Sequence, residues 1–444
     1  MTYESLIEQL FSGAGASVDT RTLQPGQVFF ALPGERTHGA VYAAEALDKG
    51  ASAVVLPDGY PMTFSSERVF FHPDPLRLLG EIAAAYRAQF SLPVIAIGGS
   101  NGKTTTKALL GHLLNAQAPT LVSPRSWNNA IGVPLTLLRL SSHHRFAVIE
   151  LGDNRPGEVK ALCQIAQPTL GLITNVGWDH LEGYGSLSAN LSAKWELVDY
   201  LASQTEAVFF LNTEDQLLSA QPFPSSLRVY RYGNTSDSFA TATWMPIDWG
   251  RSRLRGRLGE ETFDLEVPLW GSYNRLNILA AISMGKVLGL SLSEMAKALQ
   301  SFQNEPYRSQ IIHRGGKTLI LEAYNANPSS LSASLQALWE SLKNGDRVAL
   351  VLGQMEELGT YTEEAHRRAL AELRPHAARI AGVLLVGPYW EIVKGESWAF
   401  PMEWVSHADF ISGAPKWMHE APVLYFKGSR RQKLEQLVER LFSE

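Results

Sequence analysis

The sequence predicts an α/β protein of three domains: a small N-terminal α/β domain, a central doubly wound and mostly parallel sheet, and a C-terminal Rossmann-like domain. Three observations support this prediction. The chain has 444 residues, which is too long for a single hydrophobic core. Short apolar runs alternate with helical patterns along most of its length, as in parallel sheets whose faces are covered by helices. One apolar run leads into a glycine-rich turn, GGSNGKTTTK, which opens a helix.

The expected strands fall into three groups, one for each domain. Residues 1–90 contain the short runs QVFFAL, SAVVLP and RVFFHP, separated by helical stretches. Residues 91–304 contain PVIAIGG, FAVIELG, PTLGLITNV and EAVFFLN, which are typical of buried parallel strands. In the same domain, the alternation in RSRLRGRLGEETFDLEVPLWG predicts a hairpin, and a helix is expected from about Asn274. Residues 305–444 contain KTLILEAYN, RVALVLG, GVLLVG and PVLYFKGS, each followed by a helical pattern.

Composition limits the possible functions. The net charge is −5 and no basic run occurs, which argues against binding to an extended nucleic-acid backbone. The single cysteine, Cys163, excludes an internal disulfide framework. The first residues, MTYESLIEQLF, lack a basic segment and a cleavage site, and no apolar run approaches the length of a membrane span. We therefore expect a cytoplasmic, monomeric protein without a membrane span, which acts on small molecules.

The turn from Gly98 to Gly102 has the features of a phosphate-binding loop. Glycine adopts positive φ readily, so backbone N–H groups can point at an anion, and the helix N-terminus adds a partial positive charge. Lys103 would reach the β- and γ-phosphates of a nucleotide and the Thr104 hydroxyl would bind Mg²⁺, as in a Walker A loop. Ile97 stands where the first glycine of that pattern is usual. The alternative is an ordinary turn, but the strand before it and the helix after it favour phosphate binding.

Two polar residues are expected at the carboxyl ends of parallel strands, the sheet edge where ligands of open parallel sheets bind. Glu150 ends the run FAVIE, and its carboxylate could hold the Mg²⁺ that bridges nucleotide phosphates. His180, in GWDHLEGYGS, is a candidate ligand for a second metal or a phosphate neighbour. The alternative for His180 is a packed or surface histidine.

Two further motifs leave their function open. Lys194 lies in the helical pattern SAKWELV, and pattern alone predicts that its ammonium extends into solvent. In RSWNNAIGVPLTLL, Asn128 and Asn129 precede a Gly-Val-Pro turn. These amides could bind a polar ligand or simply cap the helix that follows.

Together these motifs resemble the Mur ligase family, the ATP-dependent amide ligases that build the peptidoglycan stem peptide. The resemblance covers essentially the whole chain. Its motifs, in chain order, are GGSNGKTTTK, SWNNAIGVPLTLL, VIELGDNRPGE, TNVGWDHLEGYGS, SAKWEL, GSYNRLN, YRSQ, YNANP, GQMEELG and LYFKGSR. Several are weak when taken singly, but ten in this order are highly specific.

The resemblance implies a site for ATP and two Mg²⁺ ions. The residues expected to contact ATP are Gly99, Ser100, Asn101, Gly102, Lys103, Thr104, Thr105, Asn274, Asn277, Arg308 and Glu322. Glu322 stands where the family usually places an aspartate on the ribose. The implied metal-binding positions are Thr104, Glu150, His180 and Lys194, with Lys194 modified to an anionic carbamate. The implied catalytic residues are Lys103, Lys194, His180 and Arg308.

The implied reaction adds D-Ala-D-Ala to UDP-N-acetylmuramoyl-tripeptide through an acyl phosphate, with release of ADP. The residues expected to contact these substrates are Ser17, Asp19, Thr20, Arg21, Asn128, Asn129, Asn325, Asn327 and Lys427. The motifs YNANP and EGYGS favour this reaction. Trp178-Asp179 instead resembles the family member that adds diaminopimelate or lysine to the UDP-muramoyl-dipeptide, although the Asp-Asn-Pro-Arg run of the diaminopimelate enzymes does not occur between residues 305 and 444. A folylpolyglutamate-type ligase is a more distant alternative.

Overall fold

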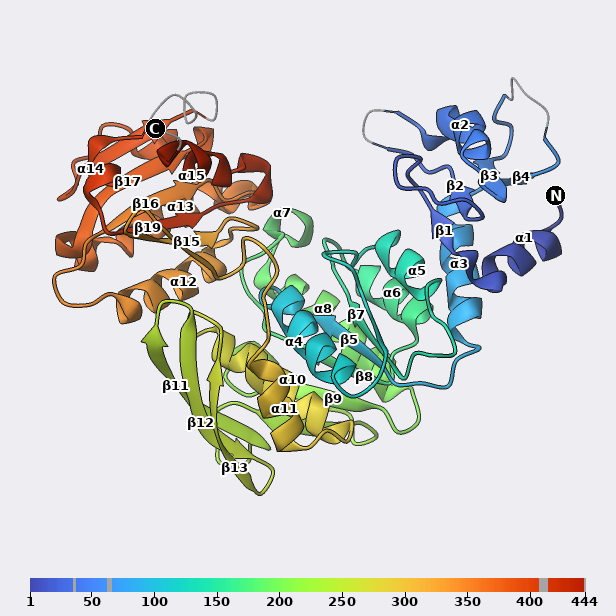
Figure 1. Ribbon diagram of the computed structural model, residues 1–444, viewed down its shortest axis with the longest axis horizontal. Helices are drawn as coiled ribbons and strands as arrows, with labels where there is room; N and C mark the ends of the chain where they lie inside the picture. Colours follow the sequence, from blue (N-terminus) through green and yellow to red (C-terminus); the bar gives the residue numbers. More distant parts are fainter. Residues whose placement is uncertain (35–36, 62–65, 407–413, 443–444) are drawn as a thin grey trace.

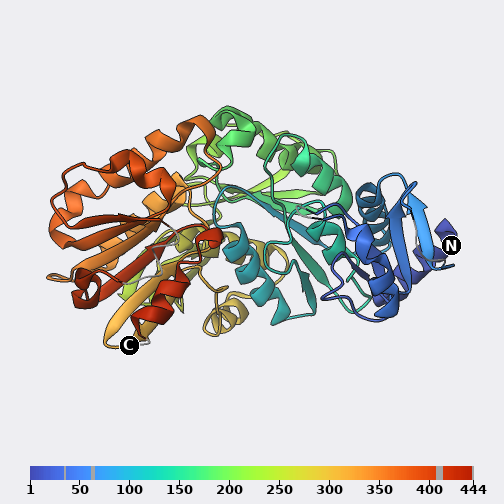
Figure 2. The ribbon, with the colours of Figure 1, turned by 90° about the horizontal axis from the view of Figure 1, so that it is seen from above.

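The computed structural model describes residues 1–34, 37–61, 66–406 and 414–442. Within these residues the strands form three sheets, which follow one another along the chain. Figures 1 and 2 show the three parts in a row, with the N-terminal part (blue) at one end and the C-terminal part (orange to red) at the other. The predicted α/β class with three domains is therefore confirmed.

The N-terminal sheet is parallel and has the strand order β1-β2-β3-β4. Its strands are β1 (Ala16–Ser17), β2 (Val28–Phe30), β3 (Ala53–Pro57) and β4 (Val69–His72). The helical segments are α1 (Tyr3–Gln9), η1 (Leu10–Ala14), η2 (Gly39–Tyr42), α2 (Ala43–Asp48) and α3 (Pro75–Arg87). Helix α3 joins this part to the central one, because Tyr86 donates to the Leu140 carbonyl at 2.8 Å and Arg87 donates to the Ala166 carbonyl at 3.0 Å.

The central sheet has the order β13-β12-β11-β10-β9-β8-β5-β7-β6. Its parallel strands are β5 (Val94–Gly98), β6 (Thr120–Val122), β7 (Phe146–Glu150), β8 (Leu170–Ile173), β9 (Val208–Asn212) and β10 (Arg228–Tyr232). The predicted hairpin is present as β12 (Arg251–Leu258) and β13 (Glu261–Val267). It is extended by β11 (Ala240–Asp248); the expected strands included neither β11 nor β6 and β10.

Helices cover both faces of the central sheet, as the complete burial of β5 requires. Val94 and Ala96 pack with α5 (Gly132–Leu137), α6 (Glu158–Ala166) and α8 (Leu187–Ala202). Ile95 and Ile97 pack with α4 (Lys103–Asn115), α10 (Asn274–Val287) and α11 (Leu292–Leu299) on the other face. The remaining helices of this domain are the short α7 (Leu181–Tyr184) and α9 (Gln216–Ser219).

The C-terminal sheet has the order β14-β15-β19-β16-β17-β18, and all of its pairs are parallel except β14 with β15. Its strands are β14 (Gln310–Arg314), β15 (Lys317–Glu322), β16 (Val348–Gly353), β17 (Ile380–Val386), β18 (Met402–Val405) and β19 (Val423–Lys427). Its helical segments are α12 (Pro328–Ser341), η3 (Gly359–Tyr361), α13 (Thr362–Ala371), η4 (Arg374–Arg379), η5 (Pro388–Val393), α14 (Lys416–Glu420), η7 (Arg430–Gln432) and α15 (Glu435–Leu441).

The two larger sheets direct their carboxyl ends at the same place. Residues that end or directly follow strands of the central sheet, such as Glu150 and Thr174, line one cavity together with Glu322 and Lys427 from the C-terminal sheet. The fold thus creates a ligand site between two domains, as the rule for open parallel sheets predicts. No helix in the described ranges is long and apolar enough to span a bilayer.

Candidate active site

The cavity between the central and C-terminal domains has a volume of about 480 Å³. It gathers residues that are far apart in the sequence. The predicted site residues that line it are Ser100, Asn101, Gly102, Lys103, Thr104, Thr105, Asn128, Glu150, His180, Asn277, Arg308, Glu322, Asn325 and Lys427. A cavity of this size and polarity is typical of a site for a nucleotide or another small molecule.

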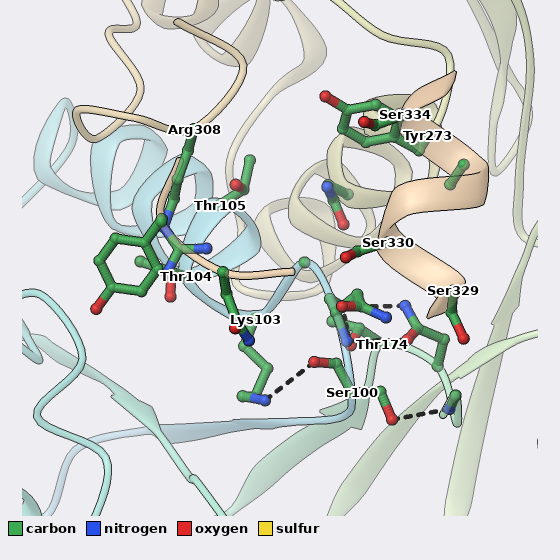
Figure 3. A pocket seen from close by; sticks show the side chains of 18 of the residues that line it. Ser100, Lys103, Thr104, Thr105, Thr174, Tyr273, Arg308, Ser329, Ser330 and Ser334 are labelled. Carbon is green, nitrogen blue, oxygen red and sulfur yellow. Dashed lines mark hydrogen bonds between the residues drawn. The ribbon is translucent and has the colours of Figure 1, made fainter. Parts of the chain in front are cut away.

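The glycine-rich turn forms one wall of this cavity, as Figure 3 shows. Gly99 and Gly102 have φ of 122° and 82°, and a Cβ atom on Gly102 would lie 2.4 Å from the Asn277 side chain. Glycine is therefore required at Gly102 by both conformation and space. Lys103 folds back so that its ammonium donates to the carbonyls of Gly99 and Ser100. This loop precedes the N-terminus of α4, which favours a bound anion.

Helix α12 forms the opposite wall and also begins at the cavity. Asn327 caps it by accepting from the Ser330 N–H at 2.8 Å, and its amide donates to Asn101 of the turn at 2.8 Å. Ser329, Ser330 and Ser334 of α12 lie across the cavity from the turn (Figure 3). Two helix N-termini thus meet at one polar cavity. The serines were missed, because helical serines carry no signal of their own in a sequence.

A polar group surrounds Glu322 at the side of the cavity. Its Oε1 atom accepts from the Tyr273 hydroxyl and from the Ser309 N–H at 3.0 Å, and its Oε2 atom lies 3.7 Å from Lys427 Nζ. Burial lowers the pKa of Lys427, while Glu322 acts in the opposite direction. Tyr273 and Ser309 were not predicted to belong to the site.

The predicted asparagine pair, Asn274 and Asn277, lies at the start of α10. Asn277 donates to Asn274 at 2.9 Å, and Asn274 donates to the Trp270 carbonyl at 2.8 Å. Asn277 lines the cavity, whereas Asn274 is fully buried and supports it.

Arg308 reaches the cavity from the segment that links the two domains. Its guanidinium lies 3.8 Å from the centre of the Tyr324 ring, a cation–π arrangement. Its buried Nε atom finds no hydrogen-bond partner in the described part of the chain. Tyr324 in turn shares a hydrogen bond with Ser126 of the central domain. Because this guanidinium is held in place by the ring and keeps an unused hydrogen-bond donor, it is suited to bind an anionic ligand.

Glu150 ends β7 beside the turn, as predicted, but it has a partner that was not predicted. Its Oε2 atom lies 3.0 Å from the ammonium of Lys107, which donates to the Arg125 carbonyl, and its Oε1 atom accepts from Asn128 at 2.9 Å. Burial acts to raise the pKa of Glu150, but the cations Lys107, Lys103 and Arg308 outweigh it and lower this pKa below its ordinary value. Glu150 is therefore a buried carboxylate.

His180 lines the cavity and pairs with the C-terminal domain. Its Nδ1 atom contacts Glu357 Oε2, and this hydrogen bond lowers the pKa of Glu357. Both residues have positive φ, 49° and 63°, so two strained turns meet at the domain boundary. Among the residues that the structure describes, no three His, Cys, Asp or Glu side chains gather to form a metal site.

Lys194 is buried, so the expectation that its ammonium extends into solvent is wrong. Its side chain is 1% exposed, and Nζ lies 2.8 Å from Asp153 Oδ2 and 3.6 Å from Asp179 Oδ2. The 16-residue helix α8 packs this side chain against α7 and the loop after β7, and that tertiary contact overrides the local pattern. Asp179 also accepts from Ser100 at 2.5 Å, which connects Lys194 to the phosphate-binding turn.

Other predicted residues lie outside the cavity wall. The Asn129 side chain accepts from the N–H groups of Ile131 and Gly132 in the turn that leads into α5, whereas its neighbour Asn128 faces the cavity. In the N-terminal domain, Asp19 forms an ion pair with Arg21 at 2.6 Å, while Ser17 and Thr20 are buried close by. These four residues lie in a domain that contributes no residue to the cavity lining.

Comparison with known proteins places this geometry in a family. The description "Mur ligase family, catalytic domain" matches residues 14–87, "Mur ligase middle domain" matches residues 97–285, and "Mur ligase, glutamate ligase domain" matches residues 307–399. The UDP-N-acetylmuramoyl-tripeptide–D-alanyl-D-alanine ligase of Bacillus subtilis is 31% identical over 96% of this chain and 93% of its own length. The enzyme of the same name from Escherichia coli is 32% identical over the same shares.

Solved structures agree with these sequence relatives. A MurF crystal structure from Acinetobacter baumannii superposes with a TM-score of 0.87 at 26% identity, and covers 99% of this chain and 98% of its own. A MurF ligase from Thermotoga maritima in complex with ADP has a TM-score of 0.81 at 25% identity and covers 97% of both chains. The chain belongs to the Mur ligase family.

Proposed function

We propose that this protein is an ADP-forming amide ligase that joins D-Ala-D-Ala to UDP-N-acetylmuramoyl-tripeptide in peptidoglycan precursor synthesis. One observation carries the proposal. A single cavity unites the phosphate-binding turn, two helix N-termini and Arg308, in a chain whose curated relatives with that activity match it over nearly their whole length.

The chemistry requires an activated carboxylate, because a carboxylate and an amine do not condense in water unaided. In the proposed reaction the terminal carboxylate oxygen of the tripeptide attacks the γ-phosphorus of ATP, and the bond to ADP breaks. The amine of D-Ala-D-Ala then attacks the acyl carbon, and phosphate leaves. Lys103 and Arg308 provide positive charge for the transferring phosphoryl group, and the N-termini of α4 and α12 provide oriented N–H donors.

The residues present fit a divalent cation. Two buried carboxylate oxygens face only a lysine among the described residues: Glu150 Oε2 lies 3.0 Å from Lys107 Nζ, and Asp179 Oδ2 lies 3.6 Å from Lys194 Nζ. Thr104 and His180 line the same cavity as Glu150. Since no three acidic or histidine side chains gather within the described ranges, we propose that Mg²⁺ binds together with the nucleotide, whose phosphate oxygens complete the ligand set. Bound Mg²⁺ would neutralise charge on those phosphates.

The carbamate on Lys194 is part of the same proposal. Lys194 is buried near the turn, and Ser100 and Asp179 connect it to the loop that would hold the phosphates. A carbamate there would turn a cation into an anion that can orient a metal.

The substrates are proposed to enter from the two outer domains. The UDP group would bind near Ser17, Asp19, Thr20 and Arg21, and the dipeptide would bind near Asn325 and Lys427, where a neutral amide and an ammonium can receive a zwitterion. Asn327 would support this region through its bond to Asn101. A cytoplasmic location and a monomeric state complete the proposal.

The test is a matrix of ligation reactions. Phosphate release and product mass are measured with ATP and Mg²⁺, for the UDP-muramoyl-dipeptide and the tripeptide, each with D-Ala-D-Ala, lysine or diaminopimelate. We expect product only from the tripeptide with D-Ala-D-Ala, and none in matched reactions of the Lys103→Ala variant. Preferential use of the dipeptide with lysine or diaminopimelate would contradict the proposal and indicate the preceding ligation step.

A further inference from the structure

Lys194 and its neighbours form a buried polar group that the proposed reaction does not explain fully. We call it the Lys194 cluster: Asp153, Asp179, Tyr184, Asn190 and Lys194. Asp153 and Asp179 are each 4% exposed, and Lys194 and Asn190 are 1% and 0% exposed. The group lies between α7, α8 and the loop after β7. Asp153 had no predicted function.

The contacts in this cluster suit an ammonium ion. Lys194 Nζ lies 2.8 Å from Asp153 Oδ2, donates to Asn190 Oδ1 and lies 5.3 Å from the centre of the Tyr184 ring. The Tyr184 hydroxyl donates to the same Asp153 oxygen, which fixes that carboxylate in place. Asp153 is therefore the closest anionic partner of the lysine, and Asp179 is the second at 3.6 Å.

The charge of the cluster depends on the state of the lysine. The ammonium and the two carboxylates together carry a net charge of −1. Asp179 accepts from the Ser100 hydroxyl at 2.5 Å and lies 3.6 Å from the Lys194 ammonium, contacts that suit an anionic carboxylate. A carbamate on Lys194 would bring the net charge to −3 in a water-excluded site, which is strongly unfavourable. One divalent cation would return it to −1.

We propose that Asp153 makes the carbamylation of Lys194 conditional on a divalent cation. This inference deepens the proposed function and rests on its assignment of a carbamate to Lys194. Without the cation, Asp153 holds the lysine as an ammonium ion. With the cation bound, the lysine nitrogen forms a bond to the carbon of dissolved CO₂: R–NH₃⁺ and CO₂ give R–NH–COO⁻ and two protons, which pass to solvent. The change of −2 in side-chain charge matches the +2 charge of the cation.

The position of Asp179 connects this change to the nucleotide. Its Oδ1 atom accepts from Ser100 of the phosphate-binding turn, and its buried Oδ2 atom has no hydrogen-bond partner among the described residues. A cation that arrives with nucleotide phosphates at this turn would meet an available carboxylate oxygen. Carbamylation would then follow nucleotide binding, and the resting protein would carry an unmodified lysine.

The experiment measures the carbamate itself rather than turnover. The full chain is equilibrated with ¹³C-bicarbonate and the carbamate carbon is quantified by ¹³C NMR in three samples: chelator alone, ADP with chelator, and ADP with Mg²⁺. We expect carbamate occupancy to be at least about tenfold higher with Mg²⁺ and ADP than in the other two samples. The same series is run on Asp153→Asn, which keeps the shape of the side chain and removes its charge.

In Asp153→Asn we expect the carbamate to form without Mg²⁺, so that the ratio between samples falls several-fold. The matched control is Asp199→Asn, which removes an exposed charge from the same helix as Lys194 and should behave like the parent chain. Equal occupancy with and without Mg²⁺ in the parent chain would overturn the proposal, as would an unchanged ratio in Asp153→Asn or no carbamate in any sample. Ligation activity in the same preparations tests the proposed function separately.

Discussion

The protein buries two lysines beside its phosphate-binding turn, and they have different surroundings. Lys107 lies 3.0 Å from the buried Glu150 and 3.8 Å from the partly exposed Glu305, and it also donates to the Arg125 carbonyl. Lys194 faces two carboxylates that are both buried. Each lysine with its two carboxylates carries a net charge of −1, but Glu305 is partly exposed, so water screens its charge, whereas the surplus charge beside Lys194 is buried. We infer that Lys107 holds Glu150 in place permanently, while Lys194 can change its state when a cation arrives.

The largest loss of activity is expected when a third lysine, Lys103, is replaced. Lys103 lines the cavity, and its ammonium donates to two backbone carbonyls and forms no ion pair with a described residue, so its charge is available to the nucleotide. Replacing it with alanine should reduce ATP-dependent phosphate release by about a thousandfold or more, because the charge that follows the transferring phosphoryl group is lost. Phosphate release at a rate close to that of the parent chain would show that the glycine-rich turn does not take part in the reaction.

Lys194→Ala should lower activity by roughly a hundredfold, an effect typical of losing a group that orients metal ligands. If the active form is a carbamate, a short-chain carboxylic acid added to Lys194→Ala should restore part of the activity, because it supplies the missing anion. Lys107→Met should show no such rescue, since Lys107 acts as a cation. If the carboxylic acid restores activity to both variants, or to neither, the proposed difference in function between Lys107 and Lys194 is wrong.

Lys107→Met tests stability. It leaves the Glu150 carboxylate buried with its main counter-charge removed, so we expect the free energy of unfolding to fall by about 3–5 kcal/mol. Urea unfolding measures this loss. Adding Glu150→Gln to Lys107→Met should recover a large part of the stability, because the uncompensated charge disappears. If the double variant is no more stable than Lys107→Met alone, the pair is not coupled in the way the structure indicates.

The smallest effect is a pH dependence. The pKa of Glu150 is lowered in the folded protein from its ordinary value of 4.5, so the unfolded chain binds more protons in this range. The resulting stability is complete above about pH 4.5 and is lost as the pH falls through the folded pKa. Urea midpoints measured from about pH 6 to pH 3 should therefore fall less steeply for Glu150→Gln than for the parent chain. Equal slopes would contradict the assignment of Glu150 as an ionised buried group.

The glycine-rich wall of the cavity could be predicted because its signal is local. Gly99, Gly102, Lys103 and Thr104 act through the conformation of one turn, which a short stretch of sequence specifies. Glu150 was also predictable, because a carboxylate at the carboxyl end of a buried parallel strand must lie at the sheet edge. The three groups of strands and the β12–β13 hairpin could also be identified, because apolar runs and alternation are local signals.

The remaining site residues depend on contacts that no local pattern reveals. Lys107 and Lys194 lie on helices where a lysine normally reaches solvent, and they are buried only because β7, α7 and the following loops pack against those helices. The serines of α12 and Tyr273 reach the cavity only because the C-terminal domain lies against the central one. Strand β11 was missed because exposed and half-buried positions weaken its apolar signal.

In the proposed reaction, ATP activates a carboxylate at this cavity through an acyl phosphate. Its most direct test is an isotope transfer. The UDP-muramoyl-tripeptide is prepared with ¹⁸O in its terminal carboxylate and is ligated to D-Ala-D-Ala with unlabelled ATP in unlabelled water. Mass analysis of the released phosphate should find one ¹⁸O atom per phosphate, because the carboxylate oxygen leaves with the phosphoryl group. Released phosphate without ¹⁸O, in a reaction that still forms the amide product, would contradict the account.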